Sequence, residues 1–213
     1  MQSLSHARYR FNTYMAKPKQ TVTLKRVRLL GNQGDKKALR GAVKLGTALD
    51  QGLALAKDLG NEPPNVCTPT YLLSQARKIA RDKDVSLTAL DEKKMLSLGM
   101  GAFMSVSQGS DQPGKMIILR YSGGKKNEEP IALVGKGITF DTGGISLKPP
   151  PAMDEMKFDM CGAAAVLGVT KAAVEARLPI NLVTVVAAAE NMPSGRASRP
   201  GDIVTSAPVQ TSP

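Results

Sequence analysis

Two lysines and two aspartates stand close together in this 213-residue chain, on either side of a paired glycine. The segment VGKGITFDTGGISLK includes Lys136, Asp141 and Lys148, and the MKFD that follows it ends at Asp159. The apolar run 131–134 just before them predicts a strand buried on both faces. Open α/β sheets place their ligand crevices beyond the ends of such strands. The pattern therefore predicts an active site, and one that depends on metal ions.

The residue types narrow the metal chemistry. Histidine occurs once, as His6, which excludes a zinc site built from two histidines on one helix. The two cysteines, Cys67 and Cys161, have no CxxC partner, which excludes a thiolate zinc site. Carboxylate oxygens remain, and they suit Mn²⁺, Mg²⁺ or a carboxylate-bound Zn²⁺. Asp141 and Asp159 are the candidate ligands.

Several residues near this segment have more than one interpretation. Lys136 could be a ligand only as a neutral amine, a form that neighbouring dications would favour. Cys161 could be a nucleophile, but no nearby histidine would activate it, and we expect a small buried helix residue. The glycines at 143–144 either form a turn that needs positive φ or let the backbone approach a ligand closely, and these two roles are compatible. Glu190 is equally compatible with a structural role and with support of the site.

Phosphate binding is a weaker alternative. The sequence GKG at 135–137 and the sequence GGK at 123–125 are both similar to parts of phosphate-binding loops. Neither continues as GxxxxGK[ST], which is the pattern that cradles nucleotide phosphates. We therefore do not expect a nucleotide site.

Five segments resemble, in the same order, the leucyl aminopeptidase (cytosol aminopeptidase) family of two-metal exopeptidases. They are NEPPNVCTPTYL (61–72), GMGAFMSVSQGS (99–110), GKGITFDTGGISLKP (135–149), MKFDMCGAAAVLG (156–168) and ENMPSGRASRPGDI (190–203). The resemblance runs from about residue 24 to residue 206, most of the chain. It implies an enzyme that releases N-terminal residues such as leucine from peptides with a free N-terminus, and that assembles as a homohexamer.

The resemblance also implies a role for each residue of the site. Lys136 would bind one metal through its amine, Asp141 would contact both ions, and Asp159 would complete the ligands of the first. Lys148 would polarise the scissile carbonyl and stabilise the oxyanion that develops on it. Met156 would line the pocket for the first side chain of the substrate. Two divalent ions, Mn²⁺ or Zn²⁺, would bind the substrate amine and lower the pKa of a bridging water.

The sequence departs from the family pattern after Ser206. The family continues into a segment ending Asn-Thr-Asp-Ala-Glu-Gly-Arg, which supplies two carboxylate ligands and an arginine that holds a bicarbonate-like base. This chain instead reads APVQTSP over 207–213. We therefore expect a fragment, a frameshifted product or a degenerate paralogue, with impaired activity or none. The expected organisation is a connector remnant at 1–20, the first part of a catalytic domain at 21–206 and a divergent tail.

Charge and composition leave a second function open. The net charge is +11, and the first 60 residues hold 12 Lys and Arg against 3 Asp and Glu, while the others hold 17 against 15. Such asymmetry can mark a nucleic-acid surface, although solvated helix faces explain it as well. The alternative function is a non-catalytic fragment that binds homologous subunits or, less favoured, DNA.

The absence of a membrane signal and the cysteine content predict a cytoplasmic protein. No run approaches the ~18 apolar residues of a membrane span, and no signal-like apolar region follows the basic N-terminus. Two cysteines without an evident partner suit a reducing compartment. We expect no membrane partner.

Strands that alternate with helices predict a three-layer α/β/α sandwich with a largely parallel, mixed sheet. Strands are expected at 21–30, 115–121, 130–134 and 180–189. Helices are expected at 36–59, 69–80, 91–98 and 157–178. Thr68 is the expected N-cap of the second helix, with Pro69 in its first turn.

Overall fold

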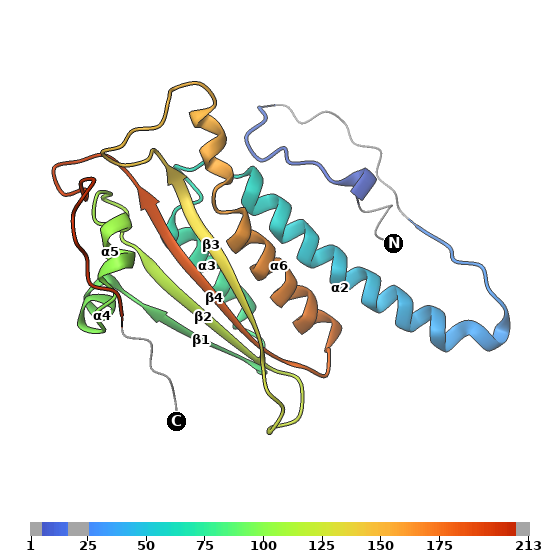
Figure 1. Ribbon diagram of the computed structural model, residues 1–213. Helices are drawn as coiled ribbons and strands as arrows, with labels where there is room; N and C mark the ends of the chain where they lie inside the picture. The colour runs from blue at the N-terminus through green and yellow to red at the C-terminus, as the bar shows by residue number, and fades with distance from the viewer. Residues whose placement is uncertain (1–5, 17–25, 208–213) are drawn as a thin grey trace.

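A four-stranded sheet forms the centre of the molecule (Figure 1). The computed structural model describes residues 6–16 and 26–207. The strands are β1 (Val85–Leu90), β2 (Lys115–Ser122), β3 (Ile131–Asp141) and β4 (Asn181–Asn191), in the order β1-β2-β4-β3. β3 and β4 are parallel, whereas β1–β2 and β2–β4 are antiparallel. The α/β class and the mixed sheet are confirmed, but the described sheet has more antiparallel pairing than predicted.

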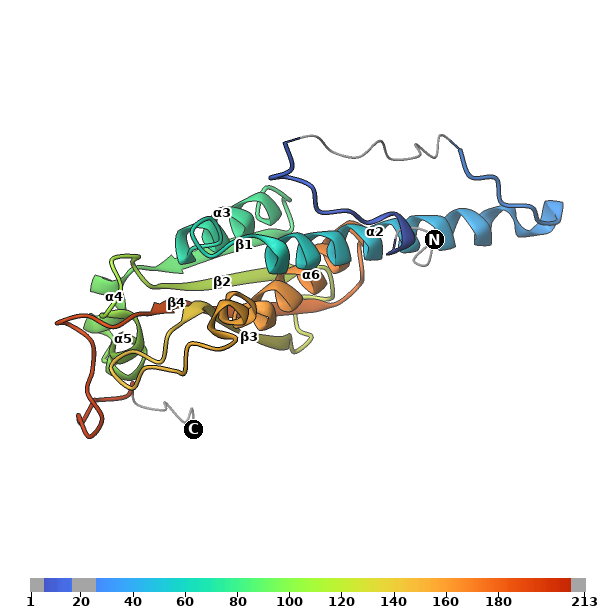
Figure 2. The same ribbon diagram turned by 90° about the horizontal axis from the view of Figure 1, so that it is seen from above.

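Three helices cover one face of the sheet (Figure 2). The helices are α2 (Lys36–Asn61), α3 (Pro69–Ile79), α4 (Glu92–Ser97), α5 (Gly101–Ser107) and α6 (Cys161–Ala176), with short 3-10 turns η1 (Gln33–Asp35) and η2 (Met153–Phe158). α2, α3 and α6 form the covering layer, and α5 lies on the side of the sheet away from α3 (Figure 2). α6 connects the parallel strands β3 and β4, so the βαβ crossover places its helix against both strands.

The hydrophobic core lies between the sheet and this helix layer. Its fully buried members come from both sides and include Leu59, Leu72, Ile117, Leu119, Leu167 and Val186. On the strands they alternate with more exposed residues, since successive side chains point to opposite faces. The strands predicted at 115–121 and 180–189 are confirmed as β2 and β4.

Local capping signals set the helix starts. The Thr68 side chain accepts a hydrogen bond from the Tyr71 backbone N–H at 3.3 Å, with Pro69 at the first position of α3. Asp91 caps α4 in the same way, through the Lys94 N–H at 2.8 Å. Each cap satisfies one of the amides that lack a partner in the first turn of a helix. The predicted starts of α3 and α4 are confirmed.

Two predicted elements are corrected, and two observed elements were not predicted. Residues 26–30 of the strand predicted at 21–30 form no strand, and 21–25 lie outside the described residues. The helix predicted at 157–178 is interrupted, because η2 ends at Phe158 and α6 begins only at Cys161. Asp159 therefore lies in the break between them. β1 and α5 were not predicted: β1 does alternate apolar and polar residues over 85–89 but is only six residues long, and α5 has only seven residues.

β3 is an edge strand of the described sheet, and the prediction that run 131–134 is buried on both faces is wrong. Ile131 is 53% exposed and Val134 is 74% exposed. The reason is topological: among the described residues, β3 pairs with β4 on one side only. No helix within the described part of the chain is both long enough and apolar enough to cross a membrane.

Candidate functional site

The predicted site residues lie around the carboxyl end of β3. Lys136 lies inside β3 and Asp141 ends it. Lys148 lies in the loop that follows, Met156 lies in η2, and Asp159 comes directly after η2. β3 and η2 pack against each other. The side-chain contacts of these five residues divide them into two groups. Among the described residues, no hydrogen bond or ion pair joins the two groups to each other.

The first group consists of Asp141, Lys148 and Met156. Lys148 Nζ donates to Asp141 Oδ2 at 2.8 Å and lies 3.0 Å from the thioether sulfur of Met156. The lysine side chain is 36% exposed and the aspartate 17%. The ammonium is thus partly shielded from water but still accessible to a ligand, which is the setting in which a charged donor interacts strongly with a developing negative charge.

The second group is the pair Lys136 and Asp159. Lys136 Nζ lies 2.6 Å from Asp159 Oδ1, with the lysine 59% exposed and the aspartate 19%. Asp159 Oδ2 is buried and has no hydrogen-bond partner among the described residues. A buried carboxylate oxygen without a partner is costly, and a bound cation is one way to satisfy it.

Asp141 is held from its other side as well. Asn191 Nδ2 donates to Asp141 Oδ1 at 2.7 Å, and the Gly143 N–H donates to the same atom at 3.0 Å. Partial burial alone would raise the pKa of Asp141, but the hydrogen bonds from Lys148, Gly143 and Asn191 outweigh it, and the pKa lies below its ordinary value. Asp141 is therefore ionised at neutral pH.

Asn191 is the residue of this site that the sequence did not reveal. It ends β4, 50 residues along the chain from Asp141, and faces it only because β3 and β4 pair in parallel. The available signal was its place in the ENMPSG segment at the end of a predicted strand. Since parallel strands end at the same edge of a sheet, that position indicates the site once β3 and β4 are known to be parallel neighbours.

The paired glycines form the turn that returns the chain from β3 toward Lys148. Gly143 has φ of 88° and Gly144 has φ of 68°, values that other residues rarely adopt. The Lys148 N–H donates to the Thr142 carbonyl at 2.9 Å and closes the turn. A Cβ on Gly144 would stand 3.0 Å from Asn191 Oδ1. The turn thus needs glycine both for its conformation and for the close approach of a neighbouring group.

Cys161 and Glu190 do not join this site. Cys161 is exposed at the start of α6, so the expectation of a buried residue is wrong. Desolvation raises the pKa of its thiol in spite of nearby Lys157, which does not favour a nucleophilic thiolate. Glu190 accepts a hydrogen bond from the Ser110 hydroxyl, and the two residues line a separate cavity of about 400 Å³.

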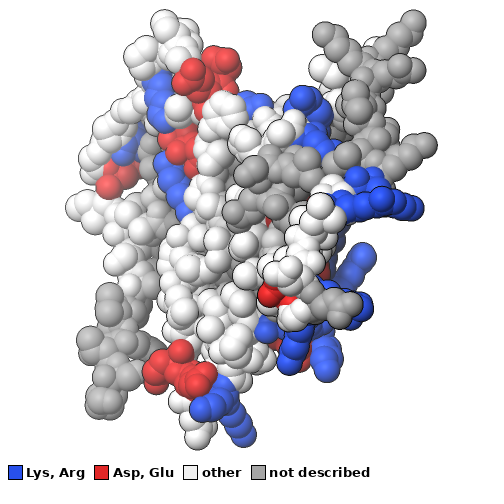
Figure 3. All heavy atoms as spheres, turned by 90° about the vertical axis from the view of Figure 1, so that its right-hand side faces the viewer, with Lys and Arg blue, Asp and Glu red and all other residues white. Residues whose placement is uncertain are grey.

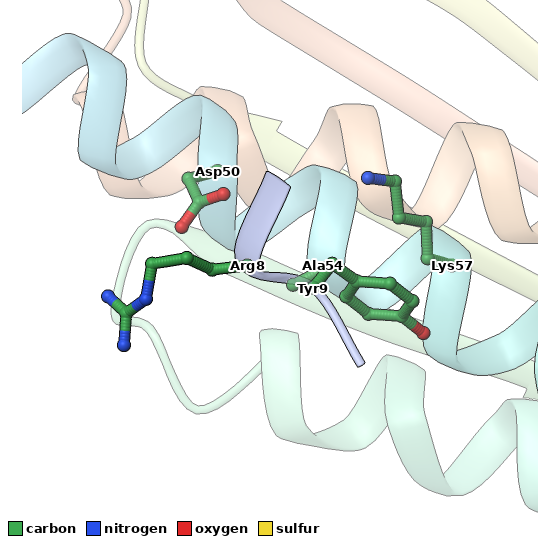
Figure 4. A pocket seen from close by; sticks show the side chains of 5 residues that line it. All are labelled: Arg8, Tyr9, Asp50, Ala54 and Lys57. Atoms are coloured by element: carbon green, nitrogen blue, oxygen red, sulfur yellow. The ribbon is translucent and has the colours of Figure 1, made fainter. Parts of the chain in front are cut away.

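A smaller cavity of about 220 Å³ lies where the N-terminal segment crosses α2 (Figure 4). Its lining residues are Arg8, Tyr9, Asp50, Ala54 and Lys57. Figure 4 shows Lys57 and Asp50 projecting from α2. None of the predicted site residues lines it, so this cavity is separate from the lysine–aspartate groups.

The described residues fit a metal ion only in part. They contain no group of three or more His, Cys, Asp or Glu side chains that could hold one. The lysine–aspartate groups offer two carboxylates, Asp141 and Asp159, and the amine of Lys136. Oxygen and amine donors of this kind suit a hard divalent cation, and Asp159 Oδ2 has free lone pairs. The described residues therefore supply some, but not all, of the ligands that a metal ion needs.

Residues 54–212 match the family model described as the cytosol aminopeptidase family, catalytic domain. The chain is 53% identical to the cytosol aminopeptidase of Pseudomonas aeruginosa PAO1 over 212 residues, which is 99% of this chain and 43% of that protein. It is 54% identical over 209 residues to a protein of Stutzerimonas stutzeri named probable cytosol aminopeptidase, covering 98% of this chain and 42% of that protein. The chain spans less than half the length of these relatives.

Proposed function

Because the chain belongs to the cytosol aminopeptidase family, we propose that its two lysine–aspartate groups are part of the active site of a two-metal aminopeptidase. The substrates would be peptides with a free N-terminus, and the residue released would be leucine-like. One observation carries the proposal: β3 and the turn and η2 that follow it carry two lysine–aspartate pairs, Lys148–Asp141 and Lys136–Asp159, with Asp159 Oδ2 buried and unpartnered among the described residues.

Lys136, Asp141 and Asp159 would hold the metal, Mn²⁺ or Zn²⁺. When bound, divalent ions supply Lewis acidity and make a water nucleophilic near neutral pH. The described donors are two carboxylates and one amine, which is a set for one ion rather than two. We therefore propose that this chain by itself is inactive or impaired.

Lys148 would act on the substrate carbonyl. Its ammonium donates one N–H to Asp141 Oδ2 at 2.8 Å and a second to the Met156 sulfur at 3.0 Å, and the third N–H could donate to an oxygen that gains negative charge. Met156 would line the pocket for the first side chain, since its thioether lies 3.0 Å from Lys148 Nζ. An unbranched thioether adapts its shape to an aliphatic side chain.

Metal titration and peptide hydrolysis test this proposal together. The purified chain should bind Mn²⁺ weakly, at one site, and Asp141→Ala should remove that binding. It should hydrolyse leucine p-nitroanilide slowly or not at all. A chain extended after Ser206 with the remaining part of a relative's catalytic domain should gain metal-dependent hydrolysis, which Lys148→Ala should abolish. Hydrolysis by the extended chain that survives Lys148→Ala would refute the role given to that lysine.

A second candidate function is binding to homologous subunits, as in a hexamer. The exposed edge of β3, with Val134 74% exposed, favours it. DNA binding has less support, because Lys and Arg lie beside Asp and Glu at several places on the face in Figure 3.

The names of the relatives place them in the cytosol, and we propose the same location for this chain.

A further inference from the structure

The side-chain amide of Asn191 has a fixed place beside Asp141. A register shift in β3 between Ile138 and Asp141 puts Asp141 opposite Asn191 in the parallel pairing of β3 with β4. The Asn191 carbonyl accepts hydrogen bonds from the backbone N–H and the hydroxyl of Thr142, at 3.0 and 2.9 Å. The backbone from which the amide projects is therefore anchored to the turn that follows Asp141.

The amide is also oriented. Its Nδ2 donates to Asp141 Oδ1 at 2.7 Å, and its Oδ1 stands beside Gly144, where any Cβ would be 3.0 Å away. Asp141 Oδ1 accepts a second bond from the Gly143 N–H. With Oδ1 bonded by two donors, Oδ2 is the oxygen that faces Lys148. Rotation of the carboxylate would break the hydrogen bonds on both sides at once.

We propose that Asn191 is a positioning residue: its amide holds Asp141 Oδ1 so that Oδ2 is presented to Lys148 and to the cation of the proposed active site. The inference rests on the proposed function for the cation, but the orientation of Asp141 stands on the hydrogen bonds alone. Partners that orient a ligating carboxylate commonly change metal affinity by about 10- to 100-fold when they are removed.

The chain offers a matched control at the other end of the same strand. Asn181 begins β4, and its Nδ2 donates to the carbonyls of Lys125 and Glu128 at 2.8 and 3.0 Å, far from Asp141 in the strand. Asn191→Leu and Asn181→Leu each remove one amide and keep the number and branching of its side-chain heavy atoms. Only the first should act on Asp141.

Mn²⁺ titration of the full chain is the first measurement. Asn191→Leu should weaken Mn²⁺ binding by about 10- to 100-fold, and Asn181→Leu should leave it unchanged. Equal affinity in the wild-type chain and in Asn191→Leu would overturn the proposal. A wild-type chain that binds no Mn²⁺ would refute the metal site of the proposed function, and the second measurement would then decide the role of Asn191.

Hydrogen exchange at the Gly143 amide, followed by NMR, is that second measurement and needs no metal. This N–H bonds to Asp141 Oδ1 at 3.0 Å, so it reports whether the carboxylate keeps its orientation. Exchange should be faster in Asn191→Leu and unchanged in Asn181→Leu. If Asn191→Leu does not fold, Asn191→Asp takes its place, because it keeps the shape of the side chain but has no N–H to donate. The Gly143 amide should exchange faster in this variant as well. Unchanged protection of Gly143 would overturn the proposal.

Discussion

Lys136 and Lys148 are both paired with an aspartate, but the two pairs differ in their exposure and in the other partners of the aspartate. Lys148 is the more buried of the two and shares Asp141 with Asn191 and Gly143. Lys136 is more exposed, and the second oxygen of its partner Asp159 has no bond among the described residues. The first pair has the geometry of a fixed cationic donor. The second leaves a carboxylate oxygen for another cation.

This difference predicts opposite effects of two substitutions on metal binding. Lys148→Ala removes a cation that competes for Asp141 Oδ2, so Mn²⁺ affinity should rise. Asp141→Asn removes the negative charge itself, so Mn²⁺ affinity should fall. Titration calorimetry of both variants against the wild-type chain measures the two effects. A fall of similar size in both would mean that Lys148 supports the metal site instead of competing with it.

Arg177 gives a residue-scale prediction about stability and pH. It ends α6 in the left-handed region, with φ of 53°, and its guanidinium lies 2.7 Å from Asp82 and 2.9 Å from Asp84. The hydrogen bond from Arg177 is the main reason that the pKa of Asp82 lies below its ordinary value. A carboxyl with a lowered pKa stabilises the folded chain above its unfolded pKa, near 3.9, and this effect is lost as pH falls through the folded pKa.

Asp82→Asn should therefore lower the free energy of unfolding at pH 7, and this loss of stability should become smaller as the pH falls below about 3.9. Since the ion pair is partly exposed, the loss at pH 7 should be no more than about 1 kcal/mol. Thermal unfolding at both pH values measures it. Asp154→Asn, at an exposed position without an ion pair in the described residues, is the control. A destabilisation that is independent of pH would show that charge is not its cause.

At the scale of elements, α2 and α6 cross where two glycines meet. A Cβ on Gly168 would stand 2.6 Å from the Gly52 carbonyl oxygen, and a Cβ on Gly52 would clash with the Gly168 carbonyl. Both obstacles are backbone atoms, which cannot move aside as a flexible side chain can. The close contact of the two helices therefore depends on glycine at both positions.

Gly52→Ala should destabilise the chain by about 1–3 kcal/mol, the usual cost of overpacking. Gly41→Ala, in the same helix α2 with nothing within 4 Å of the added Cβ, should instead stabilise it by about 1 kcal/mol through helix propensity. Urea denaturation of the two variants gives both values. If both substitutions stabilised the chain, helix propensity and not the crossing would control the stability effect at Gly52.

Sequence patterns predicted the elements whose signals are local. The Thr68 cap, the apolar spacing of α2 and the apolar runs of β2 and β4 all depend on neighbours in the chain, and the four elements are confirmed. The exposure of β3 and the approach of Asn191 to Asp141 depend on which strands pair. Strand order brings together residues that are far apart in sequence, which no local pattern records. The spacing of Lys136, Asp141, Lys148 and Asp159 brings them into two lysine–aspartate pairs because β3, a tight turn and η2 follow one another directly, and their role as a site stays a prediction.

At the scale of the whole molecule, β3 is an edge strand of the described sheet and pairs only with β4 (Figure 1). Ile131 and Val134 are more than half exposed there. An edge strand presents backbone N–H and C=O groups that can pair with another strand, and apolar side chains strengthen such pairing. Charged side chains on natural edge strands commonly prevent it. The apolar residues of β3 make this edge the surface through which the chain is expected to associate.

Val134→Lys should consequently shift the isolated chain from self-associated forms toward the monomer, since the edge would have to bury a charge to pair. Sedimentation velocity over a range of concentrations measures the shift. Val169→Lys is the matched control: Val169 is 51% exposed on α6 and adds the same charge away from the β3 edge. An equal shift in both variants would mean that net charge alone controls association. A wild-type chain that stays monomeric throughout would show that the β3 edge, although apolar and open, does not recruit a second strand.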